Sequence, residues 1–553
     1  GYREQVVTEA MEKEVLDLQD KNLVSLTLSD MLAKKDLGCE MDCIYLPQLL
    51  KAENFCAEKL KKLASVPAED YLYRRIWYER QRSGNPDLSV DVSGMAEELG
   101  IQYDDVQLYA IRTAAASKGM VLTGGPGTGK TTVTQGIIEV FKKFKLHILL
   151  AAPTGRAAKR ASESTGMEAK TIHRLLGYSG SGTFEHNEEH PLEGDVLIID
   201  ESSMVDIRLM SSLLKAVPEN MRLILIGDVN QLPSVGPGTV LKDIIDSGVF
   251  PVVRLTKIFR QAAESHIVTN AHRINDGLFP VIDDSNPKND FFLEIMDKKG
   301  EKLEASEIAE RTAQAIIKLL TDTIPNMYHI QPKDIQILAP MRNGSAGTIA
   351  LNKLAQEALN PEGPSIAFEG YSYRKGDRVM QTKNDYEKGV FNGDIGYIVA
   401  VNLEKELLKV EFLDTDKQET DSKFWLDYWD MDEDEEEDEE IEAHGPNPYV
   451  TYSRNDLENL DPAYAITIHK SQGSEFPAVI MPFLNSHFVM LERNLLYTGV
   501  TRAKKYLFLE GQRNAIYKAV KTISMLSRNS NLRTKLQGDF GQISFFGENM
   551  GLY

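Results

Sequence analysis

The sequence predicts an α/β protein with two parallel-sheet domains, a helical region before them and a small β-barrel inserted into the second. Two observations predict this fold class. From about residue 100, short apolar runs alternate with helical stretches, a pattern typical of a parallel sheet covered by helices. A second set of apolar runs begins near residue 335, gives way to a strand-and-turn segment, and resumes near residue 478.

The composition is that of a large globular chain. Of 553 residues, 42% are hydrophobic and 26% charged. At about 150 residues per domain, this length predicts roughly three to four domains. No apolar run is long enough to span a membrane, and the charged start is unlike a signal peptide. Three cysteines in so long a chain are typical of a reducing compartment, so we expect a cytoplasmic protein.

Residues 1–98 are expected to form the helical N-terminal region. Apolar side chains recur there at helical spacing, namely Leu46, Leu49, Leu50, Cys56, Leu60 and Leu63. All three cysteines, Cys39, Cys43 and Cys56, fall in this region. A zinc site usually needs four ligands and no histidine is near, so we expect core thiols rather than a metal site.

Buried strands are predicted wherever a short apolar run is bounded by polar or turn residues. In the first domain, 99–280, these runs are Met120–Thr123, His147–Ala152, Val196–Ile199 and Leu223–Ile226. In the second domain they are Ile335–Ala339, Ala478–Met481 and Tyr506–Leu509. Because the second set is split, that domain is expected to combine 281–367 with 456–527.

The segment 368–455 between the two halves is expected to form the inserted β-barrel. Its hairpin signals are Lys375–Asp377 and Phe391–Gly396. The barrel is interrupted at about 414–448 by an acidic run, in which twelve acidic residues and no Lys or Arg lie between Asp427 and Glu442. We expect this run to be a solvated loop.

The net charge of −21 taken alone argues against a nucleic-acid partner. Without the twelve acidic residues of the run, however, the rest of the chain carries only −9. What a nucleic acid requires is a local basic groove, because Lys and Arg must replace the counterions condensed along its phosphates. Net charge is therefore a poor guide to the partner of this chain.

A phosphate-binding loop follows the first predicted strand. Gly124–Thr131 matches the pattern G-x-x-x-x-G-K-[ST] between a strand and a helix. Glycines let backbone N–H groups surround phosphates, and the helix N-terminus favours negative charge. We expect Lys130 to reach the β and γ phosphates of ATP and Thr131 to ligate Mg²⁺. The expected nucleotide contacts in this loop are Gly125, Gly127, Thr128, Gly129, Lys130, Thr131 and Thr132.

Two carboxylates end the predicted strand Val196–Ile199. Asp200 is expected to hold Mg²⁺, because this hard cation prefers oxygen ligands. Glu201 is expected to polarise the attacking water beside the γ phosphate. Together they indicate ATP hydrolysis rather than nucleotide storage.

Three further residues are expected to act on the γ phosphate. Gln231 follows the strand Leu223–Ile226 and can hydrogen bond to this phosphate. Arg260 and Arg502 are expected to be arginine fingers, because a guanidinium fork stabilises charge spread over phosphoryl oxygens. An isolated arginine is more often a surface group, so the assignment depends on the motifs around each one.

Taken together and in order, these segments resemble the motifs of superfamily 1 helicases, specifically bacterial RecD-like ATP-dependent DNA helicases of the 5′→3′ branch. The likeness covers about residues 30–525. Its most specific parts are Ala465–Phe476 and Leu496–Lys504, which match the fifth and sixth motifs. The other matching segments are Tyr45–Leu50, Asp104–Gln107, Ala152–Arg160, Thr171–Leu176, Gly227–Gly236 and Ala339–Gly344.

The resemblance implies two RecA-like motor domains that grip ATP in a shared cleft and step along single-stranded DNA. It places Gln107 against the adenine and Glu475 at the nucleotide. It implies that 368–455 is an SH3-like barrel that helps to hold the strand. A β-hairpin at about 178–192 would be the pin that separates strands, or else an ordinary surface hairpin.

The resemblance also supplies the expected DNA contacts. Hydroxyl, imidazole and cationic side chains position a strand through its phosphates without reading its sequence, so we expect little sequence specificity. An RNA substrate stays open. The expected DNA-contact residues are Thr154, Arg156, Lys159, His173, Arg342, Thr467, His469 and Lys470.

Two departures from the family pattern stand out. Longer members carry an N-terminal region with helix-hairpin-helix elements that we do not find here, so it is missing or was removed. The acidic run is also foreign to the pattern, and competition with DNA or binding of a protein are alternatives to a solvated loop.

The last segment, 528–553, is expected to be a C-terminal tail. Within it, Gln542–Phe546 resembles the pentapeptide by which bacterial replication proteins dock on the sliding clamp. Two adjacent aromatic side chains could anchor in an apolar pocket. Packing of this tail on the protein's own surface is the alternative.

The favoured function is that of an ATP-dependent 5′→3′ DNA helicase, in DNA repair or replication-fork maintenance, working as a monomer. One alternative is a translocase that displaces proteins without unwinding DNA. Another is an ATP-gated DNA-binding clamp, against which the full set of hydrolytic residues argues.

Overall fold

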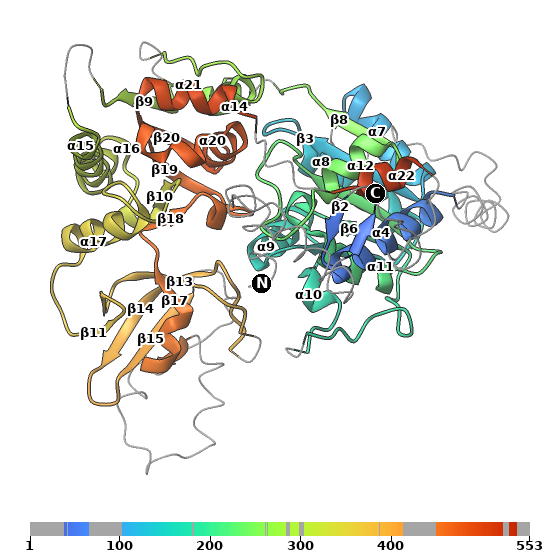
Figure 1. Ribbon diagram of the computed structural model, residues 1–553, viewed down its shortest axis with the longest axis horizontal. Helices are drawn as coiled ribbons and strands as arrows, with labels where there is room; N and C mark the ends of the chain where they lie inside the picture. Colours follow the sequence, from blue (N-terminus) through green and yellow to red (C-terminus); the bar gives the residue numbers. More distant parts are fainter. Residues whose placement is uncertain are drawn as a thin grey trace, which may run out of the picture.

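The computed structural model describes residues 38–40, 43–65, 102–179, 182–259, 262, 264–283, 288–297, 303–385, 388–412, 449–523 and 530–538. Figure 1 shows two parallel sheets in separate halves of the molecule, with a smaller antiparallel sheet beside the second. The α/β class expected from the alternating apolar runs is therefore confirmed.

The first sheet has six strands in the order β5-β4-β6-β7-β3-β8, and all its pairs are parallel. Its strands are β3 (Gly119–Gly124), β4 (Ile148–Ala152), β5 (Ala169–Thr171), β6 (Val196–Ile199), β7 (Arg222–Gly227) and β8 (Val252–Leu255). All four strands predicted for this domain are present. The inner strands β3, β6 and β7 are buried almost throughout, because helices cover both faces of the sheet.

Two apolar clusters flank this first sheet, one on each face. The first contains side chains of α7 (Asp105–Ala116) and α8 (Lys130–Lys143). The opposite cluster contains side chains of α11 (Ile207–Ala216) and α12 (Val240–Ser247). Helices α9 (Gly155–Thr165) and α10 (Ile172–Leu175) follow β4 and β5 at the carboxyl edge of the sheet. This edge of the sheet carries residues that the sequence predicts to bind and hydrolyse ATP.

The second sheet has five parallel strands in the order β18-β10-β19-β20-β9. They are β9 (Phe291–Ile295), β10 (Ile335–Ala339), β18 (Ala465–Thr467), β19 (Phe476–Phe483) and β20 (Ala503–Gly511). Strand β10 lies between two strands that follow it far along the chain. The chain thus leaves this sheet after β10 and returns to it, as the split set of apolar runs predicted.

Helices on both sides complete the second half. They are α14 (His266–Asn275), α15 (Ala305–Lys318), α16 (Ile324–Tyr328), α17 (Thr348–Leu359), α20 (Arg493–Val500) and α21 (Arg513–Lys521). A π-helical turn, η3 (Leu319–Thr323), joins α15 to α16. Among the described residues, the short 3-10 helices are η2 (Ser202–Met204), η4 (Pro332–Asp334), η6 (Arg454–Asn459), η7 (His469–Ser471) and η8 (Asn485–Met490).

The inserted segment forms an antiparallel sheet in the order β16-β15-β14-β13-β17. Its strands are β13 (Arg378–Gln381), β14 (Ile395–Asn402), β15 (Leu407–Phe412), β16 (Tyr449–Ser453) and β17 (Leu460–Pro462). A separate hairpin pairs β11 (Ser365–Phe368) with β12 (Tyr371–Arg374). Among the residues placed here, the edge strands β16 and β17 are not paired with each other, so closure into a barrel is not seen. The expected acidic loop, 414–448, lies outside the described residues.

Arg378 fixes the inserted sheet to the second parallel sheet. Its Nη1 donates to the backbone oxygens of Ile335 (2.9 Å) and Lys333 (3.2 Å), at the start of β10. The side chain is buried. This arginine therefore anchors one sheet to the other.

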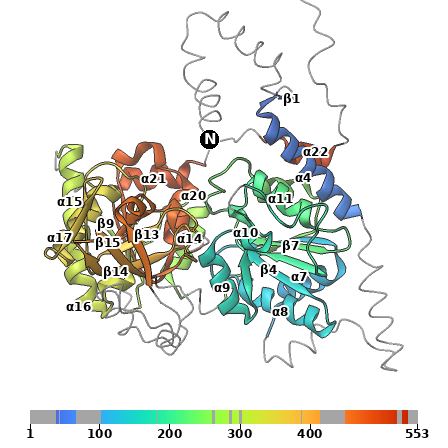
Figure 2. The same cartoon turned by 90° about the horizontal axis from the view of Figure 1, so that it is seen from below.

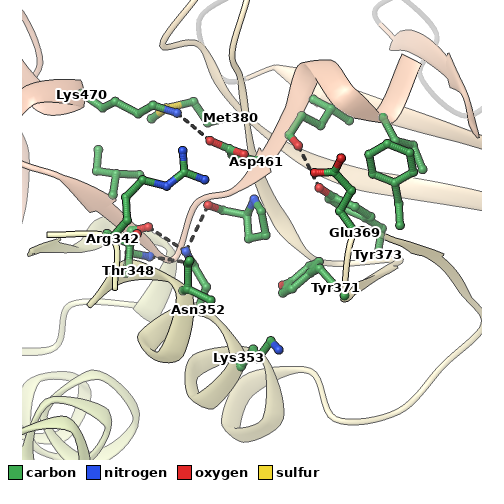
Figure 3. A pocket seen from close by; sticks show the side chains of 18 of the residues that line it. Arg342, Thr348, Asn352, Lys353, Glu369, Tyr371, Tyr373, Met380, Asp461 and Lys470 are labelled. Carbon is green, nitrogen blue, oxygen red and sulfur yellow. Dashed lines mark hydrogen bonds and ion pairs between the residues drawn. The ribbon is translucent and has the colours of Figure 1, made fainter. Parts of the chain in front are cut away.

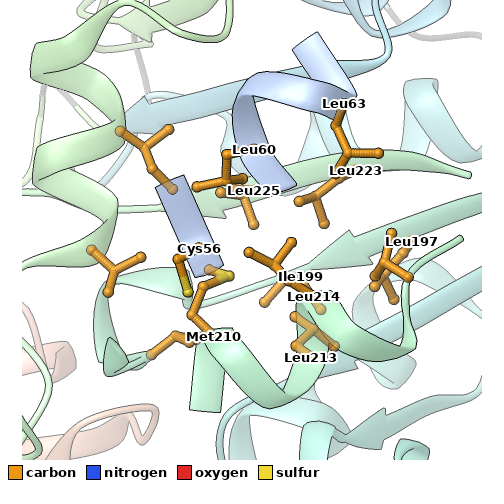
Figure 4. Packing of buried hydrophobic residues seen from close by; sticks show 14 of the residues in the cluster. Cys56, Leu60, Leu63, Leu197, Ile199, Met210, Leu213, Leu214, Leu223 and Leu225 are labelled. Atoms are coloured by element: carbon orange, nitrogen blue, oxygen red, sulfur yellow. The ribbon is translucent and has the colours of Figure 1, made fainter. Parts of the chain in front are cut away.

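The N-terminal part packs against the first parallel sheet. Residues expected to be helical instead form a two-stranded hairpin, β1 (Gly38–Glu40) and β2 (Cys43–Tyr45), followed by the expected helix α4 (Pro47–Ser65). Figure 4 shows Cys56, Leu60 and Leu63 of α4 against the leucines of β7 and α11. Cys56 is a buried free thiol whose pKa is raised by burial, as expected of a core cysteine.

The segment after α21 returns to the first half of the molecule. There α22 (Leu532–Gln537) packs against α4 and α12, and Figure 2 shows it beside α4. Leu532 and Leu536 join the apolar cluster of the first sheet. The described part of the expected C-terminal tail is therefore a packed helix. No helix in the described part of the chain is long and apolar enough to cross a membrane.

Candidate functional site

The phosphate-binding loop joins β3 to α8 at the carboxyl edge of the first sheet. Gly127 (φ 71°) and Gly129 (φ 82°) adopt left-handed conformations that other residues rarely take. Lys130 Nζ donates to the backbone oxygens of Gly124 (2.6 Å) and Gly125 (3.0 Å). The ammonium group thus lies within the loop, where phosphate oxygens could replace these carbonyl acceptors.

The other loop residues lie around this lysine. Thr128 is buried and donates from Oγ1 to the backbone oxygen of Gly125 at 2.8 Å, which stabilises the turn of the loop. Thr131 and Thr132 occupy the first turn of α8, and Thr131 is exposed. The predicted nucleotide contacts of this loop are therefore grouped at one helix N-terminus.

Gln107 is buried beside the loop and already has a structural role. Its side-chain oxygen accepts the N–H of Asp104 at 3.1 Å, while its own N–H donates to the carboxylate of Asp104 at 2.9 Å. These two bonds form a capping box at the start of α7. Its amide nitrogen faces Gly129, where a side chain would collide with it.

The segment after β8 also packs on the loop. Phe259 donates its N–H to the backbone oxygen of Gly127 at 3.3 Å. The Phe259 ring also lies close to Gly129, where a Cβ atom would come within 3.2 Å of it. Arg260, the first predicted arginine finger, follows directly but lies outside the described residues.

Asp200 and Glu201 follow β6 next to the loop. Burial and the adjacent Glu201 raise the pKa of Asp200 to about 6, while the charges of Arg160 and Lys130 act in the opposite direction. Glu201 has a φ of 50°, in the left-handed region, and its N–H donates to Asp200 Oδ1 at 2.9 Å. A divalent cation would offset the negative charge of these two adjacent carboxylates, one of which has a raised pKa.

The end of β7 meets α20 of the second half. Tyr497 donates its hydroxyl to Asp228 Oδ2 at 2.6 Å. Leu232 donates its N–H to Thr498 Oγ1 at 2.8 Å, and both groups are buried. The backbone oxygen of Gln231 accepts from the side chain of Asn494 at 3.3 Å. Gln231 is therefore at the boundary between the two parallel sheets, as a residue of a shared cleft should be.

Arg502 lies in the same boundary but is turned toward its own half. Its guanidinium donates to the backbone oxygens of Thr498 (3.2 Å) and Ser474 (3.1 Å). Burial lowers the pKa of Arg502, and the nearby charges of Glu201 and Glu475 oppose that shift. The charge of the predicted finger thus acts on Glu201, while its own nitrogens donate to two backbone carbonyls and, at 3.2 Å, to Thr501 Oγ1.

Ser474 and Glu475 are surrounded by cations from both halves. Arg156 of α9 donates to Ser474 Oγ at 2.9 Å. Arg160 Nη2 lies 2.5 Å from Glu475 Oε1, and Lys504 Nζ lies 3.6 Å from Glu475 Oε2. The segment that the resemblance placed at the nucleotide therefore links the two parallel sheets.

Seven of the eight predicted DNA contacts line three hollows, and His469 lines none of them. Thr154, which caps α9, and His173 line the first hollow, of about 360 Å³. Phe391 and Asn392 of the inserted segment line its other side. A side chain at Gly155 would touch the Phe391 ring at 3.4 Å, so the inserted segment closely approaches the first half here.

Arg156 and Lys159 line a second hollow, of about 230 Å³, between α9 and the segment that contains Ser474 and Glu475. It is therefore adjacent to the ATP residues. Arg160 and Lys504 line it too. The sequence placed Arg156 and Lys159 with Thr154 in one DNA-binding motif, but the structure places them in separate hollows.

The third hollow, of about 220 Å³, lies between the second parallel sheet and the β11–β12 hairpin. Figure 3 shows Arg342 and Lys470 on one side of it and Tyr371 and Tyr373 on the other. Thr467 lines it as well, and His469 precedes Lys470 on η7. Lys470 Nζ pairs with Asp461 Oδ2 at 2.6 Å.

The expected pin at 178–192 is compact in its described residues. One isolated antiparallel bridge joins Tyr178 to Phe184, and neither residue belongs to a named strand. The two rings pack against each other and against His173, with ring centroids 5.3–5.8 Å apart. The segment is thereby attached to the first hollow through His173.

Comparison with known proteins identifies the family. The RecBCD enzyme subunit RecD of Mycobacterium tuberculosis is 30% identical over 479 residues, which cover 78% of this chain and 73% of that protein. The chain belongs to the RecD-like helicase family. The ATP-dependent RecD2 DNA helicase of Deinococcus radiodurans is 33% identical over 475 residues, covering 85% of this chain. The chain spans only 56% of that relative's length.

Three domain families match parts of this RecD-like chain. Residues 107–237 match an AAA domain, 351–412 match the SH3 domain of ATP-dependent RecD-like DNA helicases, and 462–509 match a UvrD-like helicase C-terminal domain. A Pif1 helicase from Candida albicans is 18% identical with a TM-score of 0.42, over 76% of this chain and 96% of its own. That structural likeness is too weak to add to the argument.

The sequence reasoning missed several residues that this RecD-like site brings together. Tyr497 and Arg160 lie inside the helicase motifs. A motif alone does not show which of its side chains contacts the opposite half of the molecule. Phe391 was noted only as part of a hairpin signal. For Tyr371 and Tyr373 the sequence shows only the alternating pattern of a strand. Their hollow forms only when the β11–β12 hairpin lies against the second parallel sheet.

Proposed function

We propose that this chain is an ATP-driven 5′→3′ DNA helicase that moves along single-stranded DNA and separates duplexes. The observation that carries the proposal is the set of contacts between Asp228 and Tyr497 and between Arg160 and Glu475. Both pairs connect the first half of the molecule with the second, close to the residues predicted to act on ATP. A cleft built from two halves changes its spacing with nucleotide state, which is what a stepping motor requires.

In this proposal, Lys130 binds the β and γ phosphates and Glu201 accepts a proton from the attacking water. Gln231 and Arg502 contact the γ phosphate when the cleft closes, and Arg260 is retained as a second arginine finger. The cofactors are ATP and Mg²⁺. Thr131 and Asp200 fit the cation, because hydroxyl and carboxylate oxygens are its usual ligands. Bound Mg²⁺ would neutralise charge on the phosphates.

The proposed DNA path runs along the first and third hollows. Thr154 and His173 contribute from one parallel sheet, and Arg342, Thr467 and Lys470 from the other. Aromatic side chains of the inserted segment face both hollows, and such rings stack on bases without regard to sequence. A path that touches both sheets links each change of cleft spacing to a step along the strand.

Turnover tests the enzymatic part of the proposal. We expect ATP hydrolysis that rises when oligo-dT is added, and its loss in the Lys130→Ala and Glu201→Gln variants. Glu201→Gln should still bind ATP, because the substitution removes a base and not a phosphate contact. The matched control Lys142→Ala alters an exposed lysine at the far end of α8, which pairs only with Glu139 among the ion pairs seen here. ATP hydrolysis that ignores oligo-dT would contradict the proposal.

One observation favours a second candidate, a translocase that does not unwind. The segment expected to split strands, 178–192, has a single bridge rather than a ladder in its described residues. Displacement of streptavidin from biotinylated single strands, without separation of a tailed duplex, would support this candidate. Separation of the duplex would exclude it.

Three finer assignments complete the proposal. We propose a monomer that acts in DNA repair or at replication forks. Docking on a sliding clamp through Gln542–Phe546, which lies outside the described residues, stays a prediction. Deleting 540–553 should abolish clamp binding and leave ATP hydrolysis intact, whereas unchanged binding would end the idea.

A further inference from the structure

Arg160 lies between two glutamates that belong to different halves of the molecule. Its Nη2 is 2.5 Å from Glu475 Oε1, and its Nη1 is 3.9 Å from Glu201 Oε1. The contact with Glu475 is a close ion pair, and the contact with Glu201 is at the limit of one. The arginine thus lies between the proposed catalytic base and the opposite side of the cleft.

Glu475 has a second cation and does not depend on Arg160 alone. Lys504 Nζ lies 3.6 Å from its other carboxylate oxygen. Within the described part of the chain, Glu201 forms its ion pair with Arg160, and Arg502 acts on it only through its longer-range charge. Loss of Arg160 would therefore change the surroundings of Glu201 more than those of Glu475.

The backbone makes Glu201 sensitive to such a contact. Its φ of 50° is unusual for a residue with a side chain, and such conformations persist where the surroundings fix them. The neighbouring Asp200 accepts the Glu201 N–H at 2.9 Å and fixes the backbone. With its backbone fixed, the Glu201 side chain can still rotate, and the charge of Arg160 on one side determines where its carboxylate lies.

Arg160 is also attached to the proposed DNA path. It lies on α9, one helical turn after Arg156, so the two side chains share a face of that helix. Arg156 donates to Ser474 Oγ, next to Glu475. Thr154, the N-cap of the same helix, lines the first hollow. A strand bound in this hollow therefore contacts the element that carries Arg160.

We propose that Arg160 is a positioning residue that restrains Glu201 until single-stranded DNA engages α9. The inference rests on the proposed function and adds its regulation. An ion pair with arginine fixes where the Glu201 carboxylate lies, and a general base acts only when it lies within hydrogen-bond reach of the proton that it accepts. Movement of α9 when DNA binds shifts the guanidinium relative to Glu201, while Lys504 stays paired with Glu475. DNA would thus stimulate hydrolysis by releasing the base.

The test compares ATP hydrolysis at saturating ATP with and without saturating oligo-dT, for the full chain and for Arg160→Ala. The proposal predicts that the DNA-free kcat of the variant rises by about two- to five-fold, the range that a partly exposed ion pair supplies. The DNA-saturated kcat should stay close to wild type. The stimulation ratio should therefore fall by the same factor.

Two further variants separate positioning from a structural role. Arg160→Lys keeps the charge and should restore part of the stimulation ratio. Lys170→Ala removes an exposed lysine of the same domain that pairs with Glu168, and should leave both rates unchanged. A mere loss of folding would lower both rates of Arg160→Ala together and would leave no rescue by lysine.

An unchanged or increased ratio in Arg160→Ala overturns the proposal, as does a ratio that falls only because the DNA-saturated rate drops. These results concern Arg160 alone. If instead the wild-type chain hydrolyses ATP without any response to oligo-dT, the proposed function itself fails and this inference falls with it. The two failures are distinguished by the wild-type measurement.

Discussion

Tyr497 donates its hydroxyl to Asp228 Oδ2 at 2.6 Å, and both side chains are buried between the two parallel sheets. Burial and the carboxylate raise the pKa of Tyr497 well above its usual value, so the hydroxyl remains a donor at physiological pH. Asp228 follows β7 of the first sheet, and Tyr497 lies on α20 of the second half. The pair is thus a direct chemical link across the proposed ATP cleft.

Tyr497→Phe removes this link without changing the shape of the ring. It leaves Asp228 Oδ2 without the tyrosine donor, a loss of about 1–3 kcal/mol, while Oδ1 keeps the N–H of Asn230. We expect a lower unfolding temperature and a lower DNA-stimulated kcat, because the two halves are less firmly connected. Calorimetry and ATP hydrolysis measure both. Tyr517→Phe, at a tyrosine that is 56% exposed on α21, is the matched control and should change neither. Equal behaviour of the two variants would refute the role of this contact.

Arg342→Ala tests the third hollow. Arg342 and Lys470 line it, but Lys470 is already paired with Asp461. Arg342 should therefore contribute more to phosphate binding. We expect weaker binding of oligo-dT, and a slope of log K against log salt that is smaller by about one. Fluorescence anisotropy at several salt concentrations measures this slope. Lys318→Ala, an exposed site on α15, should bind as wild type does. An unaltered slope for Arg342→Ala would show that the DNA path does not pass through the third hollow.

Lys535→Met tests the attachment of α22. Lys535 Nζ lies 2.9 Å from Glu53 Oε1, and both side chains are almost fully buried. Removal of one partner leaves a buried charge, which costs about 3–5 kcal/mol. We expect the first half of the molecule to unfold at lower denaturant concentration. The double variant with Glu53→Gln should recover much of the loss. For the exposed pair Lys242–Asp246, Lys242→Met should change the unfolding free energy by about 0.5 kcal/mol at most. Lys535→Met as stable as wild type would contradict the burial of this pair.

Glu510 predicts a pH dependence of stability. Burial and the facing Glu294 on β9 raise the pKa of Glu510 to about 8 from its usual value near 4.5. A group whose pKa is raised on folding contributes stability below its unfolded pKa and loses it as the pH rises through the folded pKa. Wild type should therefore lose stability relative to Glu510→Gln between about pH 4.5 and 8. Unfolding temperatures across this range measure the difference. Parallel pH profiles for the two proteins would show that Glu510 is not protonated in the folded state.

The sequence predicted the elements well where hydrophobic periodicity decides them. All seven expected strands are present, because buried parallel strands are apolar throughout their length. The split of the second sheet was also predicted. The hairpin at 38–45 was not, since three-residue strands carry too little periodicity to detect.

The sequence was enough to propose candidate residues for the site, but not to predict the side chains that they contact. The motifs of the loop and of β6 are local in sequence, so Lys130, Asp200 and Glu201 were found directly. The cross-cleft contacts of Arg160 and Tyr497 depend on how two sheets meet, which no local pattern encodes. Arg156 shows this limit of local patterns. Its motif predicted a contact with DNA, whereas in the structure its side chain donates to Ser474.

Strand displacement on tailed duplexes tests the central claim most directly. Fluorescently labelled duplexes with a 5′ or a 3′ single-stranded overhang are incubated with the full chain and ATP, and with Glu201→Gln as the inactive control. We expect wild type to separate the duplex with the 5′ overhang and Glu201→Gln to separate neither. Separation of only the 3′-tailed duplex, or of neither duplex by wild type, would contradict it.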